Sequence, residues 1–162
     1  MGTGSGAIAV ALAVHLPQAV VYATDVSRKA LEVADLNRRR QNVQERVVLL
    51  EGSLLEPVGG PLDIVVSNPP YIPREDIPGL PAEVRWEPRE ALDGGLDGLE
   101  VVRALIPQAS EKLRRPGGLI VEFSPPQGAE IRSLAEATLP GHTIEIFKDL
   151  ARRERALWAT VA

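Results

Sequence analysis

The sequence predicts an α/β domain with a doubly wound, mostly parallel sheet and an antiparallel strand at its C-terminal edge. Short apolar runs alternate with segments whose apolar residues recur at three- and four-residue steps, as expected for strands alternating with helices. Two late apolar runs, 143–148 and 155–161, have no helix between them, so we expect them to pair as a hairpin-like edge. A length of 162 residues suits one domain spanning 1–162.

The N-terminal half predicts two helices and three strands. A glycine-rich turn leads directly into the apolar segment 8–14, which we expect to be helical and to end near Pro17. The apolar run 19–24 predicts a strand ending at Asp25, and Ser27 is a suitable N-cap for a helix reaching about residue 40. Two further apolar runs predict strands at 46–51 and 62–67.

The C-terminal half begins with a long loop, 68–96, rich in proline, glycine and charge. Connections of this length inside a compact domain usually carry function. An amphipathic helix is expected over 99–113, with a kink or break at Pro107, because an interior proline costs roughly 3 kcal/mol. Pro116-Gly117-Gly118 is expected to stop this helix and to lead into a strand at 119–123, followed by a helix at 127–137.

The composition limits the classes of function. There is no cysteine and there are only two histidines, so we expect no metal site. No apolar run is long enough to cross a bilayer and the first residues do not resemble a signal peptide, which predicts a cytoplasmic protein without membrane contact. The net charge of −4 and the pI near 5.3 argue against a general attraction to nucleic acid.

A nucleotide-cofactor pattern opens the chain. Gly2, Thr3, Gly4 and Gly6 form a loop that lets a ligand approach the backbone, and Asp25 ends the next strand, where a carboxylate can accept hydrogen bonds from ribose hydroxyls. This pattern alone does not separate NAD from S-adenosylmethionine. A tight strand-to-helix turn with a solvated Asp25 is the structural alternative.

The second motif, Asn68-Pro69-Pro70-Tyr71, follows the expected strand 62–67. Ligands of open α/β sheets bind beyond the carboxyl ends of strands. The prolines leave stiff backbone carbonyls free to accept hydrogen bonds, and Asn68 adds an amide, so the tetrapeptide is suited to grip an NH2 group. A proline-rich turn in which Asn68 satisfies nearby backbone is the alternative. Both loops together favour methyl transfer over hydride transfer.

Several motifs together resemble the HemK/PrmC family of release-factor glutamine N5-methyltransferases. The matching segments are Gly2 to Ala9, Asp25-Val26-Ser27, Ser67 to Ile72, Glu87 to Gly95, Asp97-Gly98-Leu99, Pro116-Gly117-Gly118, Glu122, Gln127 and Lys148-Asp149-Leu150. The resemblance implies a Rossmann-like fold and a methyl group taken from S-adenosylmethionine. It also implies class I peptide-chain release factors as partners, methylated on the glutamine amide of their Gly-Gly-Gln loop.

The resemblance also suggests roles for individual residues. Asn68 and the Pro69 carbonyl would hold the substrate amide and act with Tyr71 as the catalytic set, while Pro70 and Glu87 would join them in binding substrate. Asn68 would also help to bind the cofactor. Ser53 stands where the family usually places an aspartate for the adenine amino group. The family's N-terminal helical domain and first strand have no counterpart, so we expect a catalytic domain without its first strand.

Three alternatives remain open from the sequence. One is another amino-group methyltransferase, acting on a ribosomal-protein glutamine or on adenine in nucleic acid; the acidic pI weighs against adenine. Another is an inactive chain that serves as a binding module. The third concerns assembly, since a homodimer could cover the exposed sheet edges.

Overall fold

The computed structural model describes residues 1–161 and divides into two compact units, Met1–Gly59 and a second that begins at Gly60. The predicted α/β class is confirmed in both units, which carry strands and helices in the expected order. That the whole chain forms one domain stays a prediction.

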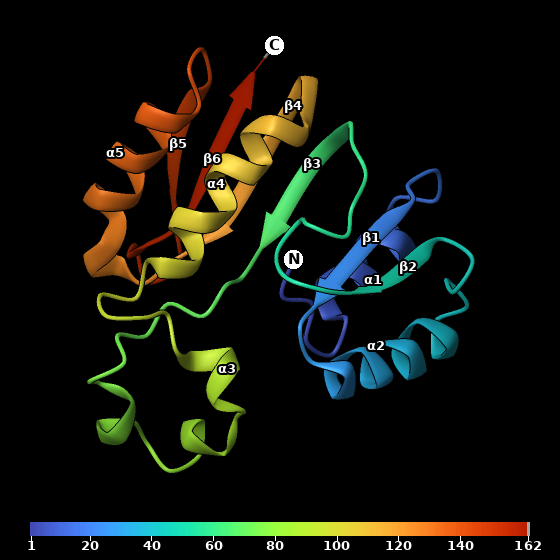
Figure 1. Cartoon of the computed structure of the whole chain (residues 1–162), viewed down its shortest axis with the longest axis horizontal. Helices are drawn as coiled ribbons and strands as arrows, with labels where there is room; N and C mark the ends of the chain where they lie inside the picture. The colour runs from blue at the N-terminus through green and yellow to red at the C-terminus, as the bar shows by residue number, and fades with distance from the viewer. Residues whose placement is uncertain (162) are drawn as a thin grey trace. The chain divides into compact units, whose positions relative to one another are not determined.

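The first unit is a parallel pair of strands with two helices (Figure 1). Its elements are α1 (Ala7–His15), β1 (Val21–Asp25), α2 (Arg28–Arg40) and β2 (Val47–Glu51). The predicted N-cap is confirmed, because the Ser27 hydroxyl accepts a hydrogen bond from the backbone N–H of Ala30. The core is built from small and branched side chains: Ala9, Val10, Ala13, Ala23, Val43 and Val47.

The second unit contains a four-stranded mixed sheet in the order β3-β4-β6-β5. Its strands are β3 (Leu62–Ser67), β4 (Leu113–Glu122), β5 (Thr143–Lys148) and β6 (Glu154–Val161). β3 runs parallel to β4, whereas β6 is antiparallel to both of its neighbours. The predicted antiparallel hairpin at the C-terminal edge is therefore confirmed. β3 is an edge strand of this sheet, and a homodimer through such an edge stays a prediction.

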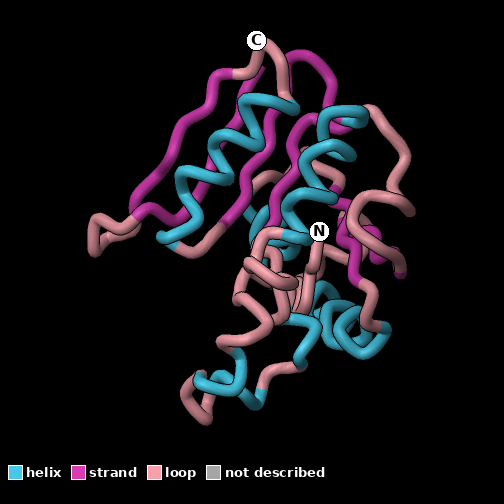
Figure 2. Tube along the Cα trace, turned by 60° about the vertical axis from the view of Figure 1, so that its left-hand side comes forward, coloured by secondary structure: helices cyan, strands magenta, loops and turns pink. Residues whose placement is uncertain are grey.

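Helices α4 (Glu100–Lys112) and α5 (Gly128–Thr138) lie side by side on this sheet (Figures 1 and 2). Of the two outcomes expected at Pro107, the break is wrong, since α4 continues through this residue, and the kink stays a prediction. Pro107 is exposed, while Ile106 and Ala109 on either side are fully buried. Burial of the apolar face holds the helix together despite the missing N–H.

The predicted start of the next strand at residue 119 is also wrong, whereas the helix ends close to the predicted residue 113. α4 ends at Lys112 and β4 begins at Leu113, so Pro116-Gly117-Gly118 lies within the strand. The register explains how the strand accommodates these residues. Leu62 pairs with Leu113 but Ile64 pairs with Gly118, so β4 bulges between the two pairs.

The long loop after β3 has more local structure than its sequence pattern predicts. It contains the short helices η1 (Ile77–Gly79), η2 (Val84–Trp86) and α3 (Arg89–Leu92), and η3 (Pro125–Gln127) follows β4 (Figure 1). A parallel β-bridge between Ile72 and Asp93 closes the loop on itself. None of the helices within residues 1–161 is long and apolar enough to span a bilayer.

The two phenylalanines of the chain provide a matched test of the second unit's core. Phe123 is fully buried, whereas Phe147 on β5 is 50% exposed. We expect Phe123→Ala to lower the free energy of unfolding by about 3–5 kcal/mol, because the cavity it leaves collapses only partly. Phe147→Ala is expected to cost less than about 1 kcal/mol, as surface substitutions usually do. Urea denaturation measures both, and equal costs would contradict the assigned burial.

Candidate functional site

The glycines of the first loop have left-handed backbone conformations, with φ of 59° at Gly2, 53° at Gly4 and 80° at Gly6. Side chains rarely tolerate this region, which explains why glycine occupies these positions. The surroundings of Gly4 and Gly6 differ. A Cβ on Gly6 would lie 3.0 Å from the Cβ of Ala34, whereas one on Gly4 would meet nothing within 4 Å. Gly6 thus permits α1 to pack on α2, and Gly4 leaves the backbone open to a ligand.

The Asp25 carboxylate braces this loop. One oxygen accepts from the backbone N–H of Gly4 at 2.8 Å, and the other accepts from the backbone N–H of Ser27 at 2.9 Å. Each carboxylate oxygen keeps a further lone pair, so both remain able to accept hydrogen bonds from a ligand. Asp25 therefore has a structural task that the sequence did not predict, beside its predicted role toward ribose hydroxyls.

The loop after β2 is tied to the same strand end. The backbone N–H of Gly52 donates to the carbonyl of Asp25 at 3.0 Å, and the Thr24 hydroxyl donates to the Leu54 carbonyl at 2.7 Å. These bonds bring Ser53 to the end of β1. Thr24 was not singled out from the sequence, although a polar residue at the end of an apolar strand is a usable signal. The first unit thus gathers all of its predicted cofactor residues: Gly2, Thr3, Gly4, Gly6, Asp25 and Ser53.

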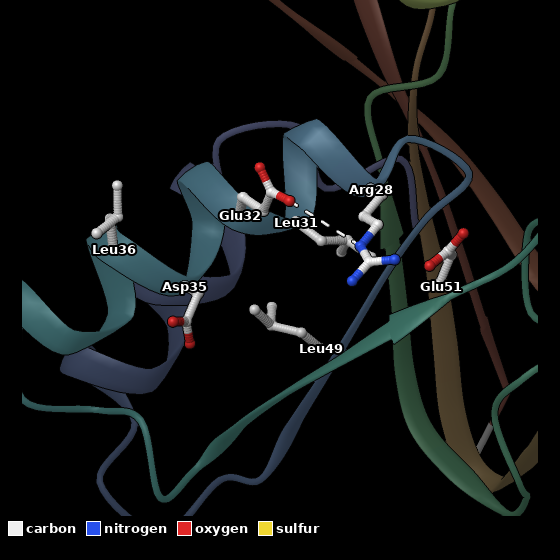
Figure 3. Close-up of a pocket in the computed structure, with 7 residues that line it drawn as sticks. All are labelled: Arg28, Leu31, Glu32, Asp35, Leu36, Leu49 and Glu51. Atoms are coloured by element: carbon white, nitrogen blue, oxygen red, sulfur yellow. Dashed lines mark ion pairs between the residues drawn. The ribbon is translucent and has the colours of Figure 1, made fainter.

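A hollow of about 720 Å³ lies elsewhere in the first unit, between α2 and β2 (Figure 3). Its lining combines apolar and charged side chains: Arg28, Leu31, Glu32, Asp35, Leu36, Leu49 and Glu51. None of the predicted cofactor residues is among them. The Arg28 and Glu32 side chains form a long, exposed ion pair at 4.0 Å on its rim. Because exposed pairs of this kind contribute little, the hollow has no built polar site.

The tetrapeptide in the second unit directly follows the buried end of β3, where Ser67 pairs with Val121 of β4. Asn68 is exposed and Pro69 is buried. Among the residues that the structure describes, no hydrogen bond engages the Asn68 side chain or the Pro69 carbonyl. Both acceptors are therefore unengaged in this part of the chain, and the Asn68 side chain is also accessible. The alternative, in which Asn68 satisfies nearby backbone, has no support in this geometry.

Tyr71 lies where burial and charge act on its hydroxyl. Burial raises the pKa of the Tyr71 phenol, the Glu122 carboxylate adds to this rise and Glu87 contributes in the same direction, while Arg155 opposes it. The phenol therefore stays protonated at physiological pH and can donate a hydrogen bond. Glu87 is exposed and close enough to act on Tyr71 electrostatically.

Gln127 and Asp93 hold the segments around the tetrapeptide, and neither residue was assigned a role from the sequence. The Gln127 amide donates to the Tyr71 carbonyl at 2.9 Å. The Asp93 carboxylate pairs with Arg74 and Arg89 and accepts from the backbone N–H of Gly95. No group of three or more His, Asp or Glu side chains within residues 1–161 is arranged to hold a metal ion.

Known proteins resemble this chain in sequence and in structure. Residues 1–78 match the family model described as the methyltransferase small domain. The chain is 51% identical over 160 residues to a release factor glutamine methyltransferase of Moorella thermoacetica, and covers 56% of that protein. It is 45% identical over 139 residues to a ribosomal protein uL3 glutamine methyltransferase of Bradyrhizobium diazoefficiens, covering 43% of it. The chain thus spans about half the length of these curated relatives.

The structural comparison confirms the predicted fold. A crystal structure of a ribosomal protein L11 methylase from Lactobacillus delbrueckii subsp. bulgaricus matches 99% of this chain and 66% of its own length. The TM-score is 0.71 at 25% sequence identity. The Rossmann-like methyltransferase fold expected from the motifs is therefore present. The predicted resemblance is confirmed as well, because the chain is similar over nearly its whole length to proteins named release factor glutamine methyltransferase.

Proposed function

We propose that this chain transfers a methyl group from S-adenosylmethionine to the side-chain N5 nitrogen of a glutamine in the Gly-Gly-Gln loop of class I peptide-chain release factors. The observation that carries the proposal is the pair of unengaged acceptors, the Asn68 side-chain oxygen and the Pro69 carbonyl, at the end of β3. The names of the relatives support glutamine as the substrate.

An amide nitrogen is a poor nucleophile because its lone pair is delocalised into the carbonyl. Asn68 and Pro69 accept one hydrogen bond each from the two N–H groups, which orients the nitrogen and favours the positive charge that develops on it. S-adenosylmethionine supplies an electrophilic methyl group on a sulfonium centre. With that cofactor bound, transfer of its methyl group would form the N–C bond as the S–C bond broke with its electron pair left on sulfur, and water would take the amide proton late.

The first unit supplies groups that suit the cofactor. The open space at Gly4 admits a ligand against the backbone, and the free lone pairs of Asp25 suit ribose hydroxyls. Ser53 offers a hydroxyl to the adenine amino group. Asn68 is assigned to the cofactor by resemblance alone.

The remaining assignments concern the substrate. Pro70 and Tyr71 shape the pocket for the glutamine side chain, and the Tyr71 phenol stays neutral. Glu87 is exposed and contacts the protein substrate rather than the reacting amide. The reaction takes place in the cytoplasm, where release factors act, and it involves no direct contact with nucleic acid.

A second candidate substrate is the glutamine of ribosomal protein uL3. The Bradyrhizobium relative bears that name, and both reactions need the same grip on an amide. Incubating the chain with labelled S-adenosylmethionine and equal amounts of a class I release factor and uL3 discriminates between them. Label on the release factor supports the proposal, and label on uL3 alone overturns its substrate. Binding of both partners without any label would identify a binding module.

One prediction concerns the two acceptors that are proposed to bind the substrate amide. Asn68→Ala removes one of the two acceptors, and we expect methyl incorporation to fall by roughly a hundredfold or more, as when one preorganised hydrogen-bonding group is deleted from an active site. The measurement is the rate of label transfer to the release factor.

Asn42→Gly is the matched control for that variant. Asn42 is exposed and has a φ of 56°, so glycine removes an amide there without backbone strain. Methyl incorporation is expected to stay at the level of the unaltered chain. Unchanged turnover in Asn68→Ala would show that the Asn68 side chain does not hold the substrate.

The second prediction tests the cofactor side. Ser53→Asp replaces a neutral acceptor by a charged one, and hydrogen bonds to charged groups are about twice as strong as neutral ones. We expect the dissociation constant for S-adenosylmethionine to fall by about tenfold in calorimetric titration. Ser133→Asp, at an exposed position of α5, adds the same charge as a control. Weaker binding in Ser53→Asp than in this control would place the adenine elsewhere.

A further inference from the structure

We propose that Gln127 is a positioning residue, whose side-chain amide fixes the Asn68-Pro69-Pro70-Tyr71 loop so that its two acceptors are held in place for the reaction. This inference rests on the proposed function, because the position of the acceptors matters only if they hold a substrate. Gln127 lies at the end of η3, beyond β4, and is separated from Tyr71 by 56 residues along the chain.

The Gln127 amide connects three segments of the second unit. Its nitrogen donates to the carbonyl of Tyr71 at 2.9 Å and to that of Asp97 at 3.3 Å. Its oxygen accepts from the backbone N–H of Ser124 at 3.0 Å. Gln127 is only 8% exposed, so these bonds replace water that cannot reach the side chain. Both ends of one buried amide are thus used to join the loop after β3 to the end of β4.

The tetrapeptide needs such a bond from outside. Pro69 and Pro70 have no backbone N–H, so this part of the loop cannot anchor itself by donating hydrogen bonds. β3 fixes the chain up to Ser67. The bond to the Tyr71 carbonyl fixes it again directly after the second proline. The acceptors on Asn68 and Pro69 lie between these two fixed points.

Neighbouring backbone is fitted closely around the same bond. Gly98 has a φ of 78°, and a Cβ there would collide with the Tyr71 carbonyl oxygen and with the Gln127 amide nitrogen. The bridge beside Tyr71 continues the connection, since Ile72 donates to the Leu92 carbonyl at 3.1 Å and Gly94 donates to the Ile72 carbonyl at 2.9 Å. The loop is therefore held at Tyr71 and Ile72, the residues that follow its two unengaged acceptors in the sequence.

The chemistry of this position requires an amide. Two of its partners are carbonyl acceptors and the third is an N–H donor, and a neutral side chain that both donates and accepts satisfies all three. Gln127→Glu keeps the size and the acceptor but loses the donor. As a carboxylate, the new side chain would face two carbonyl oxygens. Burial and those oxygens raise its pKa, and once protonated it can donate to Tyr71 again.

This difference gives the test. In mildly alkaline buffer, we expect the kcat of Gln127→Glu for methylation of a class I release factor to fall by roughly tenfold to a hundredfold, because small displacements of reacting groups have effects of that size. The KM for S-adenosylmethionine is expected to stay unchanged. In mildly acidic buffer, the ratio of variant to unaltered chain should return toward one. Gln18→Glu, at an exposed position, adds the same charge and should show no such pH dependence.

A second readout does not depend on activity. Hydrogen exchange at the backbone amides of Ile72 and Gly94 is expected to speed up in alkaline Gln127→Glu, relative to the unaltered chain, and to recover on acidification. Equal kcat and exchange in both proteins, or a loss that pH does not reverse, would overturn the role of Gln127. If the unaltered chain shows no methyl transfer but the exchange behaves as expected, the proposed function is wrong, whereas the role of Gln127 in fixing the loop is supported.

Discussion

Loops built from glycine and proline depend on contacts with other segments, and this constraint applies to the glycine loop before α1 and to the tetrapeptide after β3. Glycine leaves the backbone free to move, and proline removes a hydrogen-bond donor. A side chain from another segment fixes each loop, and in the glycine loop the backbone bonds of Thr3 to Thr24 and of Gly6 to Thr3 add to it. Asp25 accepts from the backbone of Gly4 in the first unit, and Gln127 donates to the backbone of Tyr71 in the second.

The two loops are fixed in opposite ways, one by a hydrogen-bond acceptor and the other by a hydrogen-bond donor. Each arrangement leaves unengaged the groups that are proposed to bind a ligand. The glycine loop still has N–H groups, so a carboxylate holds it and the space beside Gly4 stays open. The proline loop has only carbonyls to offer on its central residues, so a donor holds it, and it is held at Tyr71 rather than at Pro69. Among the residues that the structure describes, the Asn68 side chain and the Pro69 carbonyl are therefore left without a hydrogen bond.

Much of the fold follows from local sequence. Apolar runs bounded by turn residues gave the strands, and Ser27 gave the start of α2, because both signals lie within a few residues of the structure that they produce. The structural effects of Pro107 and Pro116 were predicted wrongly for the opposite reason. Their effect depended on burial of neighbouring side chains and on a bulge against β3, neither of which is visible locally.

The site shows the same division. The residues that offer groups to a ligand stand in compact motifs, so Asp25 and the tetrapeptide could be proposed from the sequence. Gln127 could not be given a task in this way, because its two acceptors lie 56 and 30 residues away along the chain. Contacts of that kind appear only when the chain is folded, although the motifs that they support are visible beforehand.

The two acceptors of the tetrapeptide do not by themselves discriminate between substrates. Two acceptors recognise two N–H groups, and a glutamine amide and an exocyclic amine both present them. The relatives carry names with different protein substrates although they share this chemistry. The choice of partner must therefore lie outside residues 68–71. Under the proposed function, exposed side chains of the loop between Ile72 and Asp93, among them Trp86 and Glu87, are suited to this choice because a partner can reach them. The partner contacts would then lie on other residues than the two acceptors proposed to hold the reacting nitrogen.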